Sequence, residues 1–150
     1  MSKVAVITGA SGGIGAAVAR RLAAQGCYVV LGYCRSREKA ESLCRELREA
    51  GGEAVSFRAD LTKAEEAKAL IEFAVQQYGH LDILVNNAGI SQIKLFTDIT
   101  QEDWQRMFAA NVDGIYHCCR AAVPYLVQQH SGTIINVSSI WGLCGASCEV

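Results

Sequence analysis

KVAVITGASGGIGAAVARRL, residues 3–22, is the stretch that decides the fold. Residues 3–8 form a continuous apolar run without the alternation of a half-exposed strand, which is typical of a parallel strand covered on both faces. A glycine-rich turn follows, and after it apolar residues recur at helical spacing, at Ile14, Val18 and Leu22. The stretch therefore predicts a strand, a turn and a helix in immediate succession.

The same alternation of strand and helix continues along the chain. Further apolar runs predict strands at residues 28–33, 82–86 and 133–138, and a less regular run predicts another at 53–60. Helical spacing marks the stretches between them, with apolar faces at Leu43 and Leu47 and at Ala67, Leu70, Ile71 and Ala74, and a longest stretch over residues 101–129. Strands that alternate with helices across short connections pair in parallel. The sequence therefore predicts five strands in a doubly wound parallel α/β sheet.

Local signals refine the helix boundaries. Thr62 with Glu65, and Thr100 with Asp103, have the spacing of a capping box, in which a hydroxyl accepts from the third helical amide and a carboxylate faces back. Pro124 lies inside the longest helical stretch and predicts a kink or a break at the residue before it. We therefore expect helix starts at the two threonines and an interruption late in the longest helix.

The composition fits one globular domain over residues 1–150 that binds small molecules. The chain is 51% hydrophobic and 19% charged, with 14 basic and 15 acidic side chains and a net charge of −1. Because the charges nearly balance, we expect no strongly positive surface that would attract nucleic acid or anionic lipid. No apolar run is long enough to span a bilayer. The start has no signal-peptide pattern, so we expect a cytoplasmic protein whose partners are a small-molecule substrate and further copies of itself.

The cysteines could indicate disulfides or a metal site. Their number is odd and none forms a C-x-x-C pair, which favours reduced thiols and gives no ligand spacing for a metal. We therefore predict free thiols and no bound metal at Cys27, Cys34, Cys44, Cys118, Cys119, Cys144 and Cys148.

The glycines of the first turn indicate a phosphate-binding site. Gly9, Gly13 and Gly15 follow a predicted strand and open a predicted helix. Small residues there let the backbone approach a pyrophosphate, and the first helical amides face its charge. The G-x-x-x-G-x-G spacing is neither the G-x-G-x-x-G fingerprint nor a P-loop. From the glycines alone, a turn needed only for close packing is an equal alternative.

A second motif makes the pattern more specific. Residues 8–15 read T-G-A-S-G-G-I-G, and residues 86–89, at the end of the fourth predicted strand, read N-N-A-G. With these motifs in order, the whole chain resembles the N-terminal portion of the short-chain dehydrogenase/reductase family, whose first motif T-G-x-x-x-G-I-G is matched at every fixed position. The resemblance implies a Rossmann-type three-layer α/β/α fold and a nicotinamide dinucleotide coenzyme.

The resemblance also assigns coenzyme contacts. In the family an acidic residue at the place of Asp60 lies near the adenine, although an aspartate in the sequence DLT can equally serve only to start a helix. The contacts carried over to this chain are Thr8, Gly9, Ser11, Gly13, Ile14, Gly15, Asp60, Leu61, Asn87, Ala88 and Gly89.

Two residues are catalytic candidates by the same resemblance. Asn111 matches the asparagine of the family's catalytic tetrad, and an asparagine inside a helix is locally unfavourable, although a solvent-facing side chain would need no function. Ser139 matches the substrate-orienting serine, with Ser138 in the preceding position, and its hydroxyl would donate to a substrate carbonyl oxygen. Without the other motifs, a serine there would only cap a turn.

The family's proton donor falls outside the sequence. In the family a Tyr-x-x-x-Lys motif follows the serine, and the matching position lies just past residue 150. No tyrosine within residues 1–150 has a lysine four positions on. The nearest matches have an arginine there instead, in the pairs Tyr116 with Arg120 and Tyr33 with Arg37. We therefore expect a truncated family member, with a sheet incomplete on its C-terminal side and no measurable turnover by itself. The alternative is a non-catalytic dinucleotide-binding or interaction module.

The end of the second predicted strand indicates which coenzyme is preferred. NAD-binding members usually place an acidic residue there, which accepts from the ribose hydroxyls and repels a 2′-phosphate. Here Tyr33 takes that place, and Arg35 and Ser36 follow, a cation and a hydroxyl suited to phosphate. This pattern favours NADP(H) over NAD(H), and the alternative is an ordinary basic helix start.

Substrate preference rests on resemblance alone. Within the family, residues 32–43 and residues 111–126 look most like 3-oxoacyl-[acyl-carrier-protein] reductases and related sugar or steroid alcohol dehydrogenases. That resemblance implies an NADP-dependent hydride transfer between a carbonyl and an alcohol in fatty acid biosynthesis, carried out by a dimer or tetramer.

Overall fold

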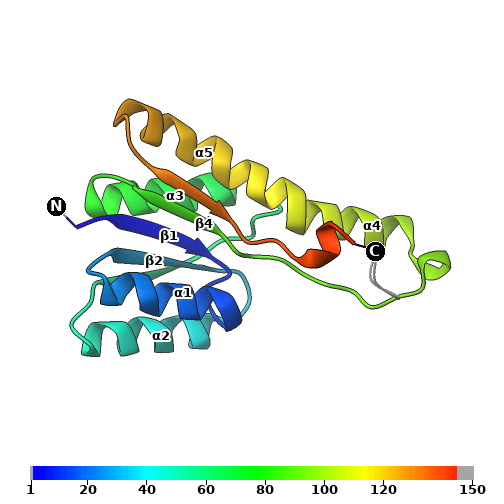
Figure 1. Ribbon diagram of the computed structural model, residues 1–150, viewed down its shortest axis with the longest axis horizontal. Helices are drawn as coiled ribbons and strands as arrows, with labels where there is room; N and C mark the ends of the chain where they lie inside the picture. Colours follow the sequence, from blue (N-terminus) through cyan, green and yellow to red (C-terminus); the bar gives the residue numbers. More distant parts are fainter. Residues whose placement is uncertain (1, 145–150) are drawn as a thin grey trace.

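The computed structural model describes residues 2–144, and within them the chain forms one five-stranded parallel sheet (Figure 1). The order across the sheet is β3-β2-β1-β4-β5, so the chain winds outward from β1 in both directions. This confirms the doubly wound α/β fold. Each observed strand lies within the residue range predicted for it, and its ends differ from the predicted ends by at most two residues. The strands are β1 (Val4–Thr8), β2 (Tyr28–Tyr33), β3 (Ala54–Arg58), β4 (Ile83–Asn86) and β5 (Thr133–Asn136).

Helices cover both faces of the sheet (Figure 1). One face carries α1 (Gly13–Ala24) and α2 (Arg37–Glu49), and the other carries α3 (Ala64–Tyr78) and α5 (Gly114–Gln128). Alternate side chains of β1 pack into the two hydrophobic cores, one on each face of the sheet. Ala5 and Ile7 pack under α1 and α2, and Val6 packs under α3 and α5. All three are fully buried, which is why the strand reads as an unbroken apolar run.

The helix after β3 begins differently from the expected capping box. The Thr62 hydroxyl donates to Asp60 Oδ1 at 2.7 Å instead of capping α3, which starts one residue later than the box requires. Glu66, rather than Glu65, reaches back and accepts from the Asp60 backbone N–H at 2.8 Å. The predicted Thr62–Glu65 box is therefore wrong, because the aspartate two residues earlier competes for the threonine.

The longest helical stretch is continuous and contains one wider turn (Figure 1). Helix α4 (Gln101–Phe108) passes through a π-helical turn, η2 (Ala109–Asp113), into α5. Pro124 lies within α5, so the break expected before it is wrong. Pro124 and Arg120, whose carbonyl loses its amide partner to the proline, are both exposed, and water can satisfy that oxygen. Neither this segment nor any other described helix has the length and apolarity to cross a membrane.

The start of α4 confirms the other predicted capping box. Thr100 Oγ1 accepts from the Asp103 N–H at 3.2 Å, and Asp103 Oδ2 accepts from the Thr100 N–H at 3.1 Å. Lys94 Nζ donates to the same carboxylate at 2.5 Å. That bond, followed by the one from the Thr100 amide, holds the pKa of Asp103 well below its usual range.

Replacing Thr100 with alanine is expected to lower the free energy of unfolding by about 1 kcal/mol, because one helical N–H loses its acceptor. Urea unfolding followed by circular dichroism measures the difference. Thr97→Ala is the matched control, since Thr97 is an exposed threonine outside α4 whose loss should cost less than about 0.5 kcal/mol. Equal losses in the two variants would contradict the role of the cap.

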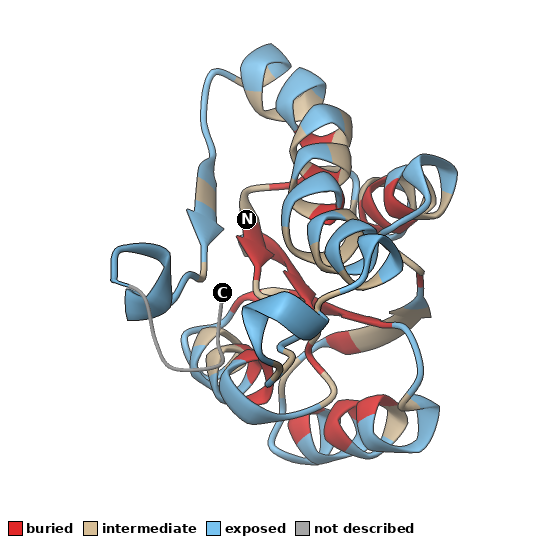
Figure 2. Ribbon diagram, turned by 90° about the vertical axis from the view of Figure 1, so that its right-hand side faces the viewer, coloured by how far each residue is buried: buried red, intermediate tan, exposed pale blue. Residues whose placement is uncertain are grey.

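Strand β5 forms one edge of the sheet and is its least buried strand (Figure 2). Three of its four residues are exposed, whereas β1 is buried along its whole length. Within residues 2–144 only β4 pairs with β5, and the Ile135 side chain is 47% exposed. The described part of the chain thus has the open side that the sequence predicted. Short 3-10 turns, η1 (Phe96–Asp98) and η3 (Ile140–Gly142), lie in the loops after β4 and β5.

The cysteines within residues 2–144 are all free thiols, as expected. Cys118 is fully buried between α5 and the sheet, and burial raises its pKa to about 12. Cys34 and Cys144 are exposed. Cys148 lies outside the described residues.

Candidate functional site

The two sequence motifs meet where β1 and β4 end side by side. These strands are neighbours in the sheet, so Thr8 at the end of β1 lies beside the residues that follow β4. The buried Thr8 hydroxyl accepts from the backbone N–H groups of Asn87 and Ala88, both at 3.0 Å. It donates in turn to the Val85 carbonyl at 3.3 Å. One side chain of the first motif thus satisfies two amides of the second.

The asparagines of the second motif fix β4 against both neighbouring strands. Asn87 Nδ2 donates to the backbone carbonyls of Thr8 at 3.0 Å and Gly9 at 3.2 Å. Asn86 is buried and faces the other way, where its Nδ2 donates to Asn136 Oδ1 on β5 at 2.8 Å. The end of β4 is therefore held on both sides by side-chain amides.

The turn after β1 has a closely packed floor and an open mouth. Gly9 has a φ of +64°, and a Cβ on it would lie 2.8 Å from Ala88 Cα. A Cβ on Gly15 would lie 2.5 Å from Asn87 Nδ2 and 2.6 Å from the Gly9 carbonyl oxygen. A Cβ on Gly12, by contrast, would meet no atom within 4 Å. This shape leaves the first amides of α1 accessible to an anion, as a diphosphate site requires.

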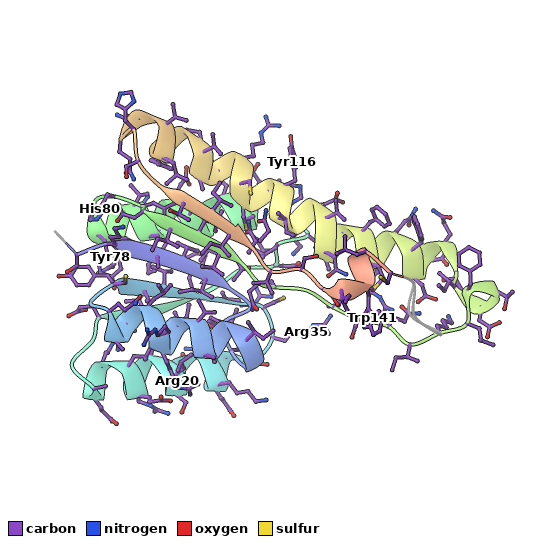
Figure 3. The ribbon with its side chains drawn as sticks, in the orientation of Figure 1. Arg20, Arg35, Tyr78, His80, Tyr116 and Trp141 are labelled. Atoms are coloured by element: carbon purple, nitrogen blue, oxygen red, sulfur yellow. The ribbon has the colours of Figure 1, made fainter. Side chains whose placement is uncertain are left out.

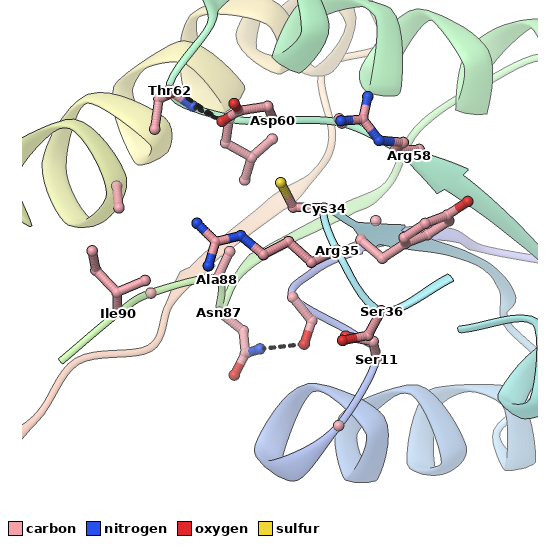
Figure 4. A pocket seen from close by; sticks show the side chains of 18 of the residues that line it. Ser11, Cys34, Arg35, Ser36, Arg58, Asp60, Thr62, Asn87, Ala88 and Ile90 are labelled. Atoms are coloured by element: carbon pink, nitrogen blue, oxygen red, sulfur yellow. Dashed lines mark hydrogen bonds between the residues drawn. The ribbon is translucent and has the colours of Figure 1, made fainter. Parts of the chain in front are cut away.

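A cleft of about 920 Å³ lies at the carboxyl ends of the strands (Figure 4). Ligands of open parallel sheets bind at this end, next to the point where the strand order reverses. The cleft brings together the glycine turn, the ends of β2 and β3, and the second motif. The predicted coenzyme contacts that line it are Gly9, Ser11, Tyr33, Arg35, Ser36, Asp60, Leu61, Asn87, Ala88 and Gly89.

The cleft is lined by positive charge although the chain as a whole is not. The described residues that line it include three cations, Arg35, Arg58 and Arg106, and one acidic side chain, Asp60. Outside the lining, Asp103 pairs with Arg106 and Glu66 with Arg58, whereas Arg35 has no such ion pair among the described residues. Asp60 Oδ1 accepts from the Thr62 hydroxyl at 2.7 Å and from its N–H at 3.1 Å (Figure 4), and the hydroxyl is the main cause that lowers the pKa of Asp60. An anionic ligand with more than one negative charge fits this lining.

Four other predicted coenzyme contacts do not line the cleft. Thr8 and Gly15 are buried below it, where they shape the turn, and Gly13 and Ile14 are exposed at the start of α1. The backbone N–H groups of Gly13 and Ile14 belong to the first helical turn, which leaves its amides without partners inside the helix. Direct contact of these four residues with a coenzyme stays a prediction.

Asn111 lies in the π-helical turn η2 and binds the loop after β4. Its Nδ2 donates to the Ile90 carbonyl at 2.9 Å, and its Oδ1 accepts from the Ile90 N–H at 2.8 Å. Ile90 itself lines the cleft, so Asn111 holds one wall of it. The side chain thus makes specific contacts, unlike the free solvent-facing side chain of the alternative interpretation.

Ser139 is exposed and is not among the residues that line the cleft. Strand β5 ends at Asn136, and Ser139 caps the short turn η3, which carries Trp141 (Figure 3). The Ser139 Oγ accepts from the Trp141 N–H at 3.3 Å. This is the local cap that the alternative interpretation expects. The catalytic roles of Ser139 and Asn111 stay predictions.

Half of the described cleft lining was not predicted from the sequence. Arg58 could have been found, because it lies near the end of a predicted strand, two residues before Asp60. Arg106 could not, because it lies within α4 and its place depends on bonds to Gln92 Oε1 at 2.5 Å and Asp103 Oδ1 at 3.2 Å. The unpredicted residues are Gly12, Gly32, Cys34, Arg58, Ala59, Thr62, Ile90, Arg106, Ala109 and Ala110.

Comparison with known proteins identifies the family. A family model for short chain dehydrogenases matches residues 3–149. The chain is 40% identical over 145 residues to a 3-oxoacyl-[acyl-carrier-protein] reductase of Staphylococcus aureus, covering 97% of this chain and 59% of that protein. It is 39% identical over 144 residues to the reductase of the same name from Synechocystis, covering 96% and 58%.

A third relative, an uncharacterized oxidoreductase of Methylorubrum extorquens, is 44% identical over 138 residues, covering 92% of this chain and 55% of that protein. The chain therefore spans less than two thirds of the length of these relatives. With a family match over nearly all of its residues and both family motifs joined at the cleft, this chain belongs to the short-chain dehydrogenase/reductase family.

Proposed function

We propose that this chain binds NADP(H) and forms the coenzyme-binding part of an NADP-dependent oxidoreductase. The family and its reductase relatives imply a nicotinamide dinucleotide. The observation that carries the choice of NADP(H) is the cleft lining, which contains three arginines and one aspartate. NADP(H) bears a 2′-phosphate in addition to the diphosphate that both coenzymes share, so it needs the more cationic surroundings.

The residues present fit this coenzyme. The open mouth at Gly12 and the first amides of α1 would hold the diphosphate. Tyr33, only 8% exposed, ends β2 where NAD-binding members usually place a carboxylate, so its neutral side chain does not oppose a 2′-phosphate. Arg35 and Ser36 follow at the start of α2 and would bind that phosphate.

The reaction we propose is hydride transfer between the coenzyme and a carbonyl or alcohol. When bound, the nicotinamide supplies or accepts the hydride. Asn111 holds Ile90 in the cleft wall through two hydrogen bonds and so preserves the shape of the site. The Ser139 hydroxyl would donate to the substrate carbonyl oxygen and stabilise negative charge that develops there.

The proposed substrate is a 3-oxoacyl group carried on acyl carrier protein. Two relatives at 40% and 39% identity are named as reductases of that substrate. A positioned general acid contributes about 10²- to 10⁴-fold in rate, and no tyrosine within residues 1–150 has a lysine four positions on. We therefore propose that these 150 residues alone bind the coenzyme without turnover, as the non-catalytic alternative also would.

The complete protein is proposed to act in the cytoplasm as a homo-oligomer. Support for the homo-oligomer comes from one exposed apolar stripe along α4, η2 and α5. Side chains at helical spacing make up this stripe, and they are Trp104, Phe108, Val112, Tyr116, Val123 and Val127. An apolar stripe of this kind is suited to packing against a like helix of a second subunit.

The coenzyme preference of the chain tests the proposal. Calorimetric titration is expected to give binding of NADPH at least about tenfold tighter than binding of NADH, since a charge-assisted contact is worth about 1.5–3 kcal/mol. The double substitution Tyr33→Asp and Arg35→Ala should reverse the preference. A carboxylate would then accept from the ribose hydroxyls and repel the phosphate, and a cation would be lost.

Arg45→Ala is the matched control for this experiment, because Arg45 is exposed on α2 and does not line the cleft. It should leave the ratio of the two dissociation constants within about twofold. Equal affinity of the unaltered chain for the two coenzymes, or an unchanged ratio in the double variant, would refute this phosphate site.

A further inference from the structure

Arg58 ends β3 beside the position that the proposed function gives to the coenzyme ribose. It pairs in register with Tyr33 at the end of β2, so the two side chains leave neighbouring parallel strands at the mouth of the cleft. The Arg58 side chain is 60% exposed. Neither the sequence motifs nor the contacts proposed above give it a role.

The N–H donors of the Arg58 side chain make no hydrogen bond to any residue that the structure describes. Its Nη1 lies 3.7 Å from Glu66 Oε2, which is an ion pair beyond hydrogen-bond distance. The Glu66 carboxylate instead accepts from the Asp60 N–H and from Lys63 Nζ, both at 2.8 Å. Within residues 2–144 the Arg58 side chain has no hydrogen-bond partner. The ion pair thus keeps the guanidinium near the cleft while its donors stay available.

The hydrogen bonds of the other two cleft arginines indicate which of them has donors available for a ligand. Arg106 already donates to Gln92 and Asp103. The Arg35 side chain, like that of Arg58, makes no hydrogen bond to a described residue. In the view of Figure 4, Cys34 lies between Arg35 and Arg58. Two arginines with available donors therefore lie at the ends of neighbouring strands.

The strand order separates this pair from the diphosphate. The glycine turn follows β1, and β3 lies two strands away in the order β3-β2-β1. With about 4.8 Å between neighbouring strands, Arg58 leaves the sheet about 10 Å from the strand that bears the turn. A dinucleotide whose diphosphate lies at the turn would bring its adenosine, not its diphosphate, toward Arg58.

We propose that Arg58 is a second ligand of the 2′-phosphate of NADP(H), in addition to Arg35, and so helps determine coenzyme specificity. This inference rests on the proposed function. A phosphate dianion has more acceptor positions than one guanidinium and one hydroxyl fill, and two guanidinium groups balance its charge. Arg35 and Ser36 approach from the start of α2, and Arg58 supplies donors from β3.

Two nucleotides isolate the contribution of the 2′-phosphate: adenosine 2′,5′-bisphosphate carries it and adenosine 5′-monophosphate lacks it. In calorimetric titrations, Arg58→Met is expected to weaken binding of the bisphosphate about tenfold or more and to change binding of the monophosphate by less than about twofold. Arg58→Lys should fall between, since lysine keeps the charge and loses the planar fork. Arg45→Met, which removes an exposed arginine outside the cleft lining, should change neither.

The outcomes distinguish this inference from the proposed function. If the unaltered chain binds both nucleotides equally, NADP(H) preference itself fails. If the chain prefers the bisphosphate and Arg58→Met keeps that preference, only the role of Arg58 fails. Equal losses for both nucleotides would also overturn it, because Arg58 would then contact the adenosine. Circular dichroism checks that each variant folds. If Arg58→Met does not fold, an unchanged preference of Arg58→Lys for the bisphosphate over the monophosphate overturns the inference.

Discussion

Thr8→Val is expected to lower the free energy of unfolding by about 3 kcal/mol. Valine keeps the shape of the side chain and loses the hydroxyl that accepts from the Asn87 and Ala88 N–H groups. Thr8 is 1% exposed, its bonds to the two N–H groups are part-buried, and each buried unsatisfied group costs about 1–3 kcal/mol. The substitution should also loosen the second motif and weaken coenzyme binding.

Urea unfolding measures this effect, and two further variants control it. Thr8→Ser keeps the hydroxyl and should recover most of the lost stability. Thr97→Val removes an exposed hydroxyl whose contact is Asp98 Oδ1 at 3.3 Å, and should cost less than about 0.5 kcal/mol. A loss at Thr8 no larger than the loss at Thr97 would show that the hydroxyl does not join the two motifs.

Gly15→Ala is expected to be comparably severe, with a loss of about 3 kcal/mol and at least about tenfold weaker coenzyme binding. The added methyl group would lie 2.6 Å from the Gly9 carbonyl oxygen and 2.5 Å from Asn87 Nδ2. The carbonyl belongs to the backbone and cannot rotate away, so the turn must move. Overpacking costs about 1–3 kcal/mol, and the displaced Asn87–Gly9 hydrogen bond adds about 1 kcal/mol.

Gly12→Ala is the control within the same turn. Gly12 has an extended backbone with φ 179°, and its Cβ would meet no atom within 4 Å. Alanine is a poorer N-cap than glycine, so a loss of up to about 1 kcal/mol is expected. Denaturant unfolding and calorimetry of the two variants should therefore differ clearly. Similar losses for both would mean that Gly15 is not packed against the second motif.

The strands and their order of appearance could be predicted because both faces of the sheet are covered. Residues 4–8 are buried without exception, so their composition alone reports their environment. The capping box of Thr100 was equally predictable, since all of its atoms lie within four residues. Features set by neighbours close in sequence could thus be predicted from the sequence alone.

Features set by competition or by distant partners could not be predicted in the same way. Thr62 has the spacing of a cap, yet Asp60 takes its hydroxyl. Pro124 is tolerated in a part of α5 where it and Arg120, whose carbonyl it leaves without a donor, are exposed residues that water can reach. Motif matching predicted Thr8 as a coenzyme contact, which stays a prediction, but it did not show that the buried Thr8 hydroxyl joins the two motifs. A motif shows that a residue matters without showing what it touches.

The floor of the cleft and its rim differ in how freely they can change. Thr8 and Gly15 both contact Asn87, so a substitution there that removes the hydroxyl or adds a methyl group disturbs the turn and the second motif. Arg35 and Arg58 are exposed at the rim and can be replaced at little cost to stability. If Arg35 and Arg58 bind the 2′-phosphate as proposed, evolution or protein engineering can retune selectivity between related coenzymes through the rim, while the underlying scaffold is inherited unaltered.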